Sequence, residues 1–201
     1  MNKKIRVFII NNFPYPSLFP FFEELNEENS LLCKIFYVDE SRDYPLSSIK
    51  KLKFDSDLLP GLLSPLKLFF RSFDVLIIDG WVNLACWISF FVCKLRGKPL
   101  ILWVGSTESE KSWRRTIFLP LVKIILTNTT AFLAYGTKAK KYLLSLGVDK
   151  EKIFIAYNTV DIDFFQEQSD IWRKQKAKIK KELGIKDKKV ILFIGRLIWE
   201  K

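Results

Sequence analysis

Seven short apolar runs alternate with segments of helical periodicity along this chain, and this alternation constrains its fold more than any other feature. Each run has four to seven residues, the length of a strand rather than of a helix. The runs lie at 5–10, 32–38, 75–78, 100–104, 131–134, 153–156 and 190–194. Because strands that alternate with helices build parallel sheets with helices on both faces, we predict an α/β fold with a Rossmann-like, doubly wound parallel sheet.

The segments between the runs predict the helices and the domain boundaries. Helical periodicity is found near 18–28, 65–70, 83–95, 108–126 and 137–146. A polar stretch from about 157 to 188 contains a helix-like run at 172–183, which ends at Gly184 as helices commonly do. We therefore predict an N-terminal Rossmann-like domain at 1–165, a connector helix at 166–188, and the start of a second α/β domain at 189–201.

The composition is that of a folded protein from a reducing compartment. With 201 residues, of which 49% are hydrophobic, the chain can bury a substantial core. Its three cysteines lack paired spacing, and the longest apolar stretch, 84–93, is about half as long as a membrane-spanning helix. The N-terminus has no secretion-signal pattern. We therefore expect a cytoplasmic protein.

Positive charge is concentrated near the C-terminus. Residues 172–201 contain 11 Lys or Arg and 3 Asp or Glu, so they supply +8 of the net charge of +11. A solvated connector helix explains this composition. The alternative is a basic module that binds nucleic acid or an anionic membrane surface.

Several common chemistries are excluded by residue content. The chain has no histidine, so it cannot form a Ser-His-Asp triad, a Cys-His pair or a His-ligated metal site. Its eight glycines never fall in the spacing of a dinucleotide fingerprint or a P-loop. Two Asp-x-Asp triplets, at 55–57 and 161–163, could share a divalent cation, but turn and helix-cap roles are favoured. We predict no metal site.

A possible phosphate-binding motif follows the last apolar run. Gly195 lets the backbone turn closely, and Arg196 then stands at the carboxyl end of the predicted strand, where α/β sheets place their binding crevices. Lys201 adds a second cation. A guanidinium fork and an ammonium suit a phosphate, although most strand-end arginines are ordinary surface charges.

The order of several motifs resembles family 4 glycosyltransferases, which have the GT-B fold. Residues 131–139, the Leu146-Gly147-Val148 turn and the 153–161 segment ahead of Phe164 resemble the end of the acceptor-side domain. The segment 195–201 is similar to the motif that opens the donor domain. The beginning of the chain resembles a branch of the same family at 5–12, 14–17, 21–25, 79–81 and 97–100.

This resemblance implies one half of a GT-B enzyme. It implies transfer of a sugar from a nucleotide-sugar donor to a glycan or lipid-linked acceptor, with retention of configuration and without a metal cofactor, in cell-surface polysaccharide synthesis. Gly195, Arg196 and Lys201 match the residues that contact the donor diphosphate. No nucleic acid is expected as a partner, and the chain is expected to be a fragment that is inactive alone.

Candidate acceptor-side residues follow the predicted strands. Asn11, Asn12 and Tyr15 follow the first strand, where many family members have a glycine-rich loop instead. Ser106 and Glu108 follow the strand at 100–104, and the Glu108 carboxylate is the candidate catalytic group that would orient or deprotonate a sugar hydroxyl. The alternative for Glu108 is a favourable acid at a helix N-terminus. Asn158 is the last of these candidates, and the alternative is that it only forms a turn.

One predicted helix could also contact lipid. The segment 113–126 mixes Arg114, Arg115 and Lys123 with large apolar side chains, which suits an anionic membrane interface. A core helix that bends at Pro120 explains the same residues.

Overall fold

The computed structural model describes residues 3–38, 53–59, 61, 63–108, 113–185 and 188–194, without the side chains of 113–116. The chain divides into two compact units, Met1–Val160 and Asp161–Lys201. Each unit is described by itself. The domain boundaries predicted at residues 165 and 188 stay predictions.

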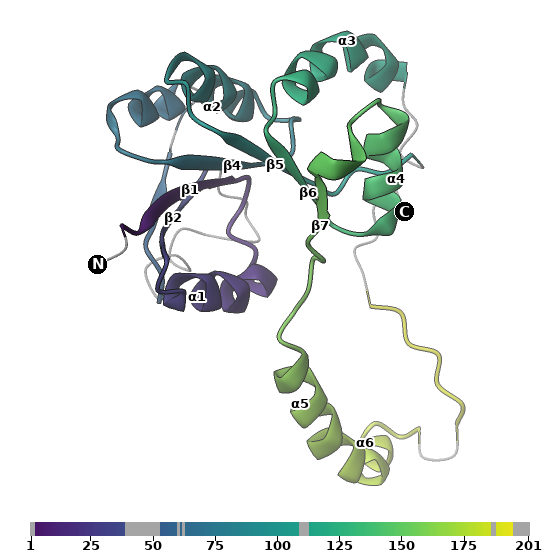
Figure 1. Ribbon diagram of the computed structural model, residues 1–201. Coiled ribbons are helices and arrows are strands. Elements are labelled where there is room, and N and C mark those ends of the chain that lie inside the picture. The colour runs from purple at the N-terminus through teal and green to yellow at the C-terminus, as the bar shows by residue number, and fades with distance from the viewer. Residues whose placement is uncertain are drawn as a thin grey trace. The chain divides into compact units, whose positions relative to one another are not determined.

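The first unit is built on a parallel sheet of seven strands in the order β3-β2-β1-β4-β5-β6-β7 (Figure 1). The order runs outward in both directions from the β1–β4 pair, so the predicted Rossmann-like, doubly wound fold is confirmed. The strands are β1 (Ile5–Asn11), β2 (Leu31–Tyr37), β3 (Ser56–Leu58), β4 (Val75–Asp79), β5 (Leu100–Val104), β6 (Ala131–Ala134) and β7 (Ile153–Ile155).

The helices lie between the strands, as the periodicity predicts. They are η1 (Pro16–Leu18), α1 (Phe19–Glu27), η3 (Ser64–Phe70), α2 (Leu84–Leu95), α3 (Trp113–Thr127), α4 (Thr137–Ser145) and η4 (Lys150–Lys152), followed in the second unit by α5 (Ile162–Lys174) and α6 (Lys176–Glu182). The helix predicted at 65–70 is a 3-10 helix. The one predicted at 172–183 begins ten residues earlier and is divided at Gln175 into α5 and α6.

Two apolar cores cover the two faces of the sheet. On one face, Phe22 of α1 is fully buried with Ile9, Ile35 and Trp103. On the other face, η3, α2, α3 and α4 pack against the sheet, and Figure 1 shows α2 and α3 on the opposite side from α1. The period-2 alternation of each strand sends successive side chains to these two cores. Among the described residues, no helix is long and apolar enough to cross a membrane.

Two sequence predictions about strands were wrong. Strand β3 was missed, because Ser56-Asp57-Leu58 is a short edge strand without an apolar run. Residues 190–194 were predicted to form a strand, but they form none, and Ile191 is 100% exposed. A strand forms by hydrogen bonding to a neighbour, and no neighbouring strand pairs with this run among the described residues.

The edge of the sheet at the amino ends of β1 and β4 is closed by an ion pair. The Arg6 guanidinium donates to Asp74 from Nε at 3.0 Å and from Nη2 at 2.9 Å, and the backbone N–H of Arg6 donates to the same carboxylate at 3.0 Å. These hydrogen bonds hold the pKa of Asp74 far below its usual range. The carboxylate therefore stabilises the fold in its ionised form.

Replacing Asp74 by Asn should make the stability of the folded state depend less on pH in the acid range. A carboxyl group with a lowered folded-state pKa contributes stability above its unfolded pKa of about 4, and this contribution is lost as the pH falls further. Urea denaturation midpoints measured between about pH 6 and pH 2 should fall less steeply for Asp74→Asn than for the parent protein. Glu24→Gln, a change of an exposed carboxyl in α1, is the control; an equal flattening in both variants would contradict the assignment.

Candidate functional site

The candidate site lies at the carboxyl ends of β1, β4, β5 and β6. The strand order reverses between β1 and β4, and ligands of open α/β sheets bind in the crevice beside such a reversal. The register pairs Ile9 with Ile77 and Ile10 with Ile78. It therefore brings the next residue of each strand, Asn11 and Asp79, to the same level of the sheet.

Asn12 bridges the two strands at this point. Its Nδ2 donates to the backbone carbonyl of Asp79 at 3.2 Å. The Cys86 thiol at the beginning of α2 lies 3.9 Å from Asn12 Oδ1 and 3.8 Å from the same Asp79 carbonyl oxygen. Burial, together with the nearby Asp79 charge, raises the pKa of Cys86 to about 12. The thiol is therefore a packed structural group rather than a nucleophile.

Asp79 and Tyr135 form a partly buried hydrogen-bonded pair. The Tyr135 hydroxyl donates to Asp79 Oδ1 at 2.9 Å, across the intervening strand β5. Burial raises the pKa of Asp79, and the hydrogen bond from Tyr135 partly opposes this rise. Burial also raises the pKa of Tyr135, and the charge on Asp79 adds to the shift. The pair therefore presents a carboxyl group that binds a proton more readily than an exposed aspartate.

Gly105 makes room for the Tyr135 ring. A Cβ atom on Gly105 would lie 2.7 Å from Tyr135 Cδ2, which is closer than carbon atoms pack. The Trp103 ring contacts Tyr135 from another side, with 5.4 Å between the ring centroids and an interplanar angle of 80°. Tyr135 is thus held between β5 and the carboxylate that it contacts.

Polar side chains of the neighbouring strands lie level with Asp79, on the α1 face of the sheet. The register places Tyr37 beside Asn11, and Asp79 beside Trp103. Tyr37 and Asn11 are fully buried and Trp103 is 4% exposed, yet Tyr37 OH, Asn11 Nδ2 and Trp103 Nε1 have no hydrogen-bond partner among the described residues. Buried polar atoms are normally paired, and polar groups left in this state indicate a place for water or ligand oxygen atoms.

The sequence-predicted acceptor residues occupy different parts of this edge. Asn12 contacts Asp79, and Tyr15 is half-buried against the α1-side core. Ser106 is half-buried directly after β5, while Glu108 is exposed. Residues 109–112, between Glu108 and the described part of α3, lie outside the described residues, so the alternative role of Glu108 at a helix N-terminus stays a prediction. Asn158 is exposed after β7, the edge strand farthest from β1 on that side.

The predicted donor residues Gly195, Arg196 and Lys201 lie outside the described residues. The second unit contains an open groove of about 810 Å³, which is lined by residues from Ser169 to Val190. Its lining includes the basic residues Arg173, Lys176, Lys180, Lys188 and Lys189.

Three of the four aspartates of the two Asp-x-Asp triplets have structural partners. Asp161 accepts from the backbone N–H of Phe164 at 2.9 Å and caps α5, as the sequence favoured. Asp55 pairs with Lys34 at 2.8 Å. Asp57 accepts from the N–H of Leu58 at 2.9 Å and from Arg71 at 3.4 Å. Within the described ranges, no group of three possible metal ligands is present.

Sequence reasoning assigned only one of the central residues of the site. Asn11 was named with Asn12 and Tyr15 as a candidate for the cleft, whereas Asp79 and Tyr135 were noted only as parts of motifs, and Tyr37 and Trp103 only as strand residues. A usable signal exists, since each is a polar or aromatic residue at the carboxyl end of an apolar run. The strand order needed to bring them together cannot be read from the runs alone.

Comparisons with known proteins agree on the fold. The sequence profile of Glycosyltransferase Family 4 matches residues 5–164. A search by sequence among curated proteins finds no match. Among solved structures, the Anabaena protein Alr3699/HepE in complex with UDP and glucose is 13% identical, with a TM-score of 0.65, over 91% of this chain and 51% of that protein.

A second group of similar structures consists of epimerases. The UDP-GlcNAc 2-epimerase from Neisseria meningitidis bound to UDP-GlcNAc is 14% identical, with a TM-score of 0.55, over 75% of this chain and 45% of that protein. At these identities the likeness shows the fold alone. The chain spans about half the length of the structures it resembles.

Replacing Tyr135 by Phe should destabilise the protein more at neutral than at acid pH. The change removes the donor to Asp79, so the folded-state pKa of this carboxyl rises further and its ionised form becomes less favourable. A raised folded-state pKa means that stability is lost as the pH rises through it. We expect a loss of about 1–3 kcal/mol near pH 7 and a smaller loss near pH 4, measured by urea denaturation. An equal loss at both pH values would contradict the pairing.

Replacing Gly105 by Ala should cost about 1–3 kcal/mol of stability, because the new methyl group overlaps the Tyr135 ring. Gly136→Ala is the matched control, since a Cβ there meets the Tyr157 ring at 3.8 Å, an ordinary contact. Thermal denaturation of the two variants provides the comparison. If Gly105→Ala were no more harmful than Gly136→Ala, the close packing of Tyr135 would be refuted.

Proposed function

The chain belongs to glycosyltransferase family 4, and on this premise we propose that it forms the acceptor-side half of a GT-B enzyme. The enzyme would transfer a hexose from a nucleotide-diphosphate sugar to a hydroxyl group of a glycan or lipid-linked acceptor, with retention of configuration. We place this reaction in cell-surface polysaccharide synthesis, in the cytoplasm at the inner face of the membrane. The UDP and UDP-sugar complexes of the similar structures support the donor class.

The Asp79–Tyr135 pair beside the β1–β4 reversal is the observation that carries the proposal for the acceptor. Sugar hydroxyls both donate and accept hydrogen bonds, so a carboxylate can bind them, and aromatic rings can pack against sugar carbons. Asp79 would accept a hydrogen bond from the acceptor hydroxyl and orient it. Asn12, Tyr15, Ser106 and Asn158 are proposed to line the acceptor cleft around it.

In the proposed reaction, basic side chains rather than a metal ion stabilise the negative charge on the departing diphosphate. The acceptor oxygen bonds to the anomeric carbon, the bond from that carbon to the diphosphate breaks, and the hydroxyl proton passes to the departing diphosphate oxygen. Gly195, Arg196 and Lys201 are proposed to contact this diphosphate, because a guanidinium and an ammonium stabilise its developing charge. Glu108 stays the second candidate for the carboxylate that assists the hydroxyl.

The two carboxylates can be separated by kinetics. In the two-domain enzyme that we propose, with labelled nucleotide sugar and membrane lipid extract, Asp79→Asn should reduce kcat/KM for the acceptor by about tenfold to a hundredfold, with an unchanged KM for the donor. Arg196→Ala should have the opposite pattern and raise the donor KM. Glu108→Gln tests the alternative site, and Glu151→Gln, on η4, is the charge-matched control.

Three outcomes would overturn parts of this proposal. If Asp79→Asn left kcat/KM for the acceptor unchanged while Glu108→Gln abolished transfer, Glu108 rather than Asp79 would be the carboxylate that contacts the acceptor. Release of free sugar without transfer to any acceptor would reject the transferase assignment. An Arg196→Ala variant with an unchanged donor KM would reject its contact with the diphosphate.

A further inference from the structure

Helix α5 of the second unit leaves its apolar side uncovered. At about 100° per residue, its large apolar side chains fall on one half of the helix, and its acidic side chains fall on the other half. A helix with such a pattern normally packs its apolar half on a core. Here the apolar side chains are between 41% and 64% exposed, and they are Ile162, Phe164, Phe165, Ile171 and Trp172. The exposed apolar half of α5 therefore marks an interaction surface.

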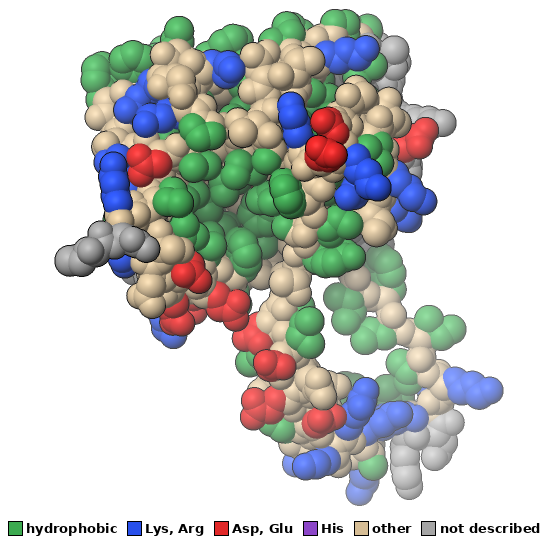
Figure 2. Space-filling view, viewed as in Figure 1, with side chains coloured by type: hydrophobic (Ala, Val, Ile, Leu, Met, Phe, Trp, Pro, Cys, Tyr) green, Lys and Arg blue, Asp and Glu red, His purple; other side chains and the backbone are tan. Residues whose placement is uncertain are grey.

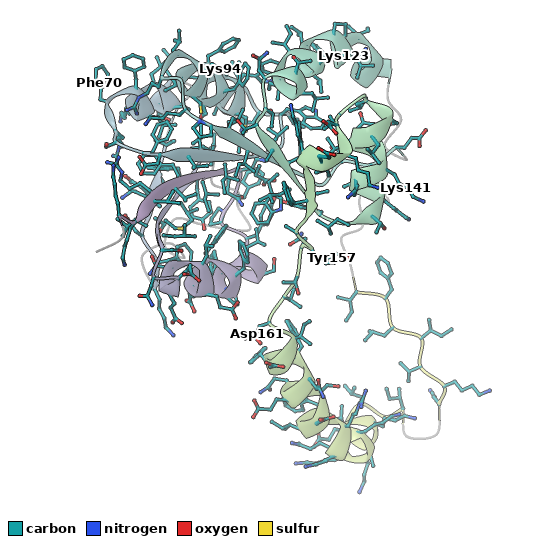
Figure 3. The ribbon with its side chains drawn as sticks, viewed as in Figure 1. Phe70, Lys94, Lys123, Lys141, Tyr157 and Asp161 are labelled. Carbon is teal, nitrogen blue, oxygen red and sulfur yellow. The ribbon has the colours of Figure 1, made fainter. Side chains whose placement is uncertain are left out.

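Opposite charges are separated along the second unit. An acidic stretch at 161–170 contains four acidic residues and no Lys or Arg. The basic residues begin at Arg173 and continue through α6. Acidic side chains gather along α5 and basic ones around α6 in Figure 2, and Figure 3 shows Asp161 at the beginning of α5. Every copy of the chain therefore carries an acidic helical segment and, after it, a basic one.

The basic residues surround the open groove of about 810 Å³ in the second unit. Ile179 and Ile185 are half-buried in this basic groove, and Trp172, Leu183 and Val190 line it with more exposed side chains. The described lining also contains the five cations from α5, α6 and the segment after them, and no Asp or Glu. The groove therefore suits an apolar segment that carries negative charge.

Gly184 turns the chain back after α6 and so gives the groove its second wall (Figure 1). Its φ of 65° lies in the left-handed region, where the absence of a side chain is an advantage. The N–H of Ile185 donates to the carbonyl oxygen of Lys180 at 2.9 Å, and that of Gly184 donates to Lys181 at 3.1 Å. The Lys180 ammonium donates to the carbonyl oxygen of Lys188 at 3.0 Å. The returning segment is therefore tied to α6, and the groove is preformed.

We propose that the acidic stretch of a second copy of this chain occupies the basic groove, and that the exchange is mutual. Two α5 helices that run side by side in opposite directions place the acidic stretch of each copy next to the basic groove of the other. Their apolar halves then cover each other. This arrangement has the two-fold symmetry of most homodimers, in which the same surface of both copies forms the interface. The inference does not depend on the proposed reaction.

Other occupants fit the groove less well. A compact anion would meet only some of the cations, because these are spread over two helices and the returning segment. A single-stranded nucleic acid stacks its bases on aromatic rings, and Trp172 is the one aromatic residue in the described lining. The acidic stretch has both the charge and the apolar side chains that the groove lacks a partner for.

Sedimentation equilibrium of the 201-residue chain measures this association. We expect a dimer whose dissociation constant rises at least about tenfold when the salt concentration is raised from about 0.05 M to about 0.5 M, because exposed charges are screened. Asp163→Lys with Glu167→Lys reverses the acidic stretch, and Lys176→Glu with Lys189→Glu reverses the groove. Each double variant should dimerise at least about tenfold more weakly, because like charges then meet.

Mixing the two double variants separates charge pairing from loss of folding. The reversed acidic stretch of one variant matches the reversed groove of the other, and the two unchanged surfaces also match. An equimolar mixture should therefore form a heterodimer as tight as the parent dimer, although each variant alone stays monomeric. A mixture that stays monomeric would overturn the proposal.

Matched controls place the same charge changes on the first unit. Glu24→Lys with Glu27→Lys on α1, and Lys138→Glu with Lys141→Glu on α4, change exposed residues and should leave dimerisation unchanged. A parent protein that stays monomeric, or controls that weaken the dimer as strongly as the test variants, would reject the inference. So would a dimer that disappears after nuclease treatment, since nucleic acid would then bridge the two copies.

Discussion

The parallel pairing of β1 with β4 is the constraint on which the rest of the first unit depends. Strands that are adjacent in the sheet but separated by two others in the sequence create the point where the strand order reverses. This pairing places Asn12 against the backbone of Asp79, at the edge where open α/β sheets bind their ligands. At the other edge, it places Arg6 next to Asp74 and allows the ion pair that closes the sheet.

The candidate site combines tight packing with incomplete hydrogen bonding. Gly105 allows the Tyr135 ring to approach β5, and the hydroxyl of that ring gives the Asp79 carboxylate a donor. Level with this carboxylate in the neighbouring strands, Asn11 and Trp103 bury polar atoms that have no partner in the described structure. Asn11 Oδ1 accepts a hydrogen bond from the backbone N–H of Phe13 at 3.3 Å, so part of this polarity stabilises the turn after β1.

Family membership and the site support the proposed function in different ways. Membership of glycosyltransferase family 4 is the premise for the proposed reaction class. The carboxyl edge of the sheet offers the Asp79–Tyr135 pair, which would bind an acceptor hydroxyl.

The sequence by itself determined the fold class, because the length of each apolar run and the glycines after the helices are local features. Its motifs carried the resemblance to the family that the profile match shows. It placed β5 and β6 at their observed ends. Only the tertiary structure decided which strand ends meet, since the strand order follows from long-range pairing. This is why Asp79 and Tyr135, 56 positions apart, were not recognised as a pair. It also decided that Phe91 and Leu95 face solvent while 190–194 forms no strand, because burial depends on neighbours that a local pattern does not contain.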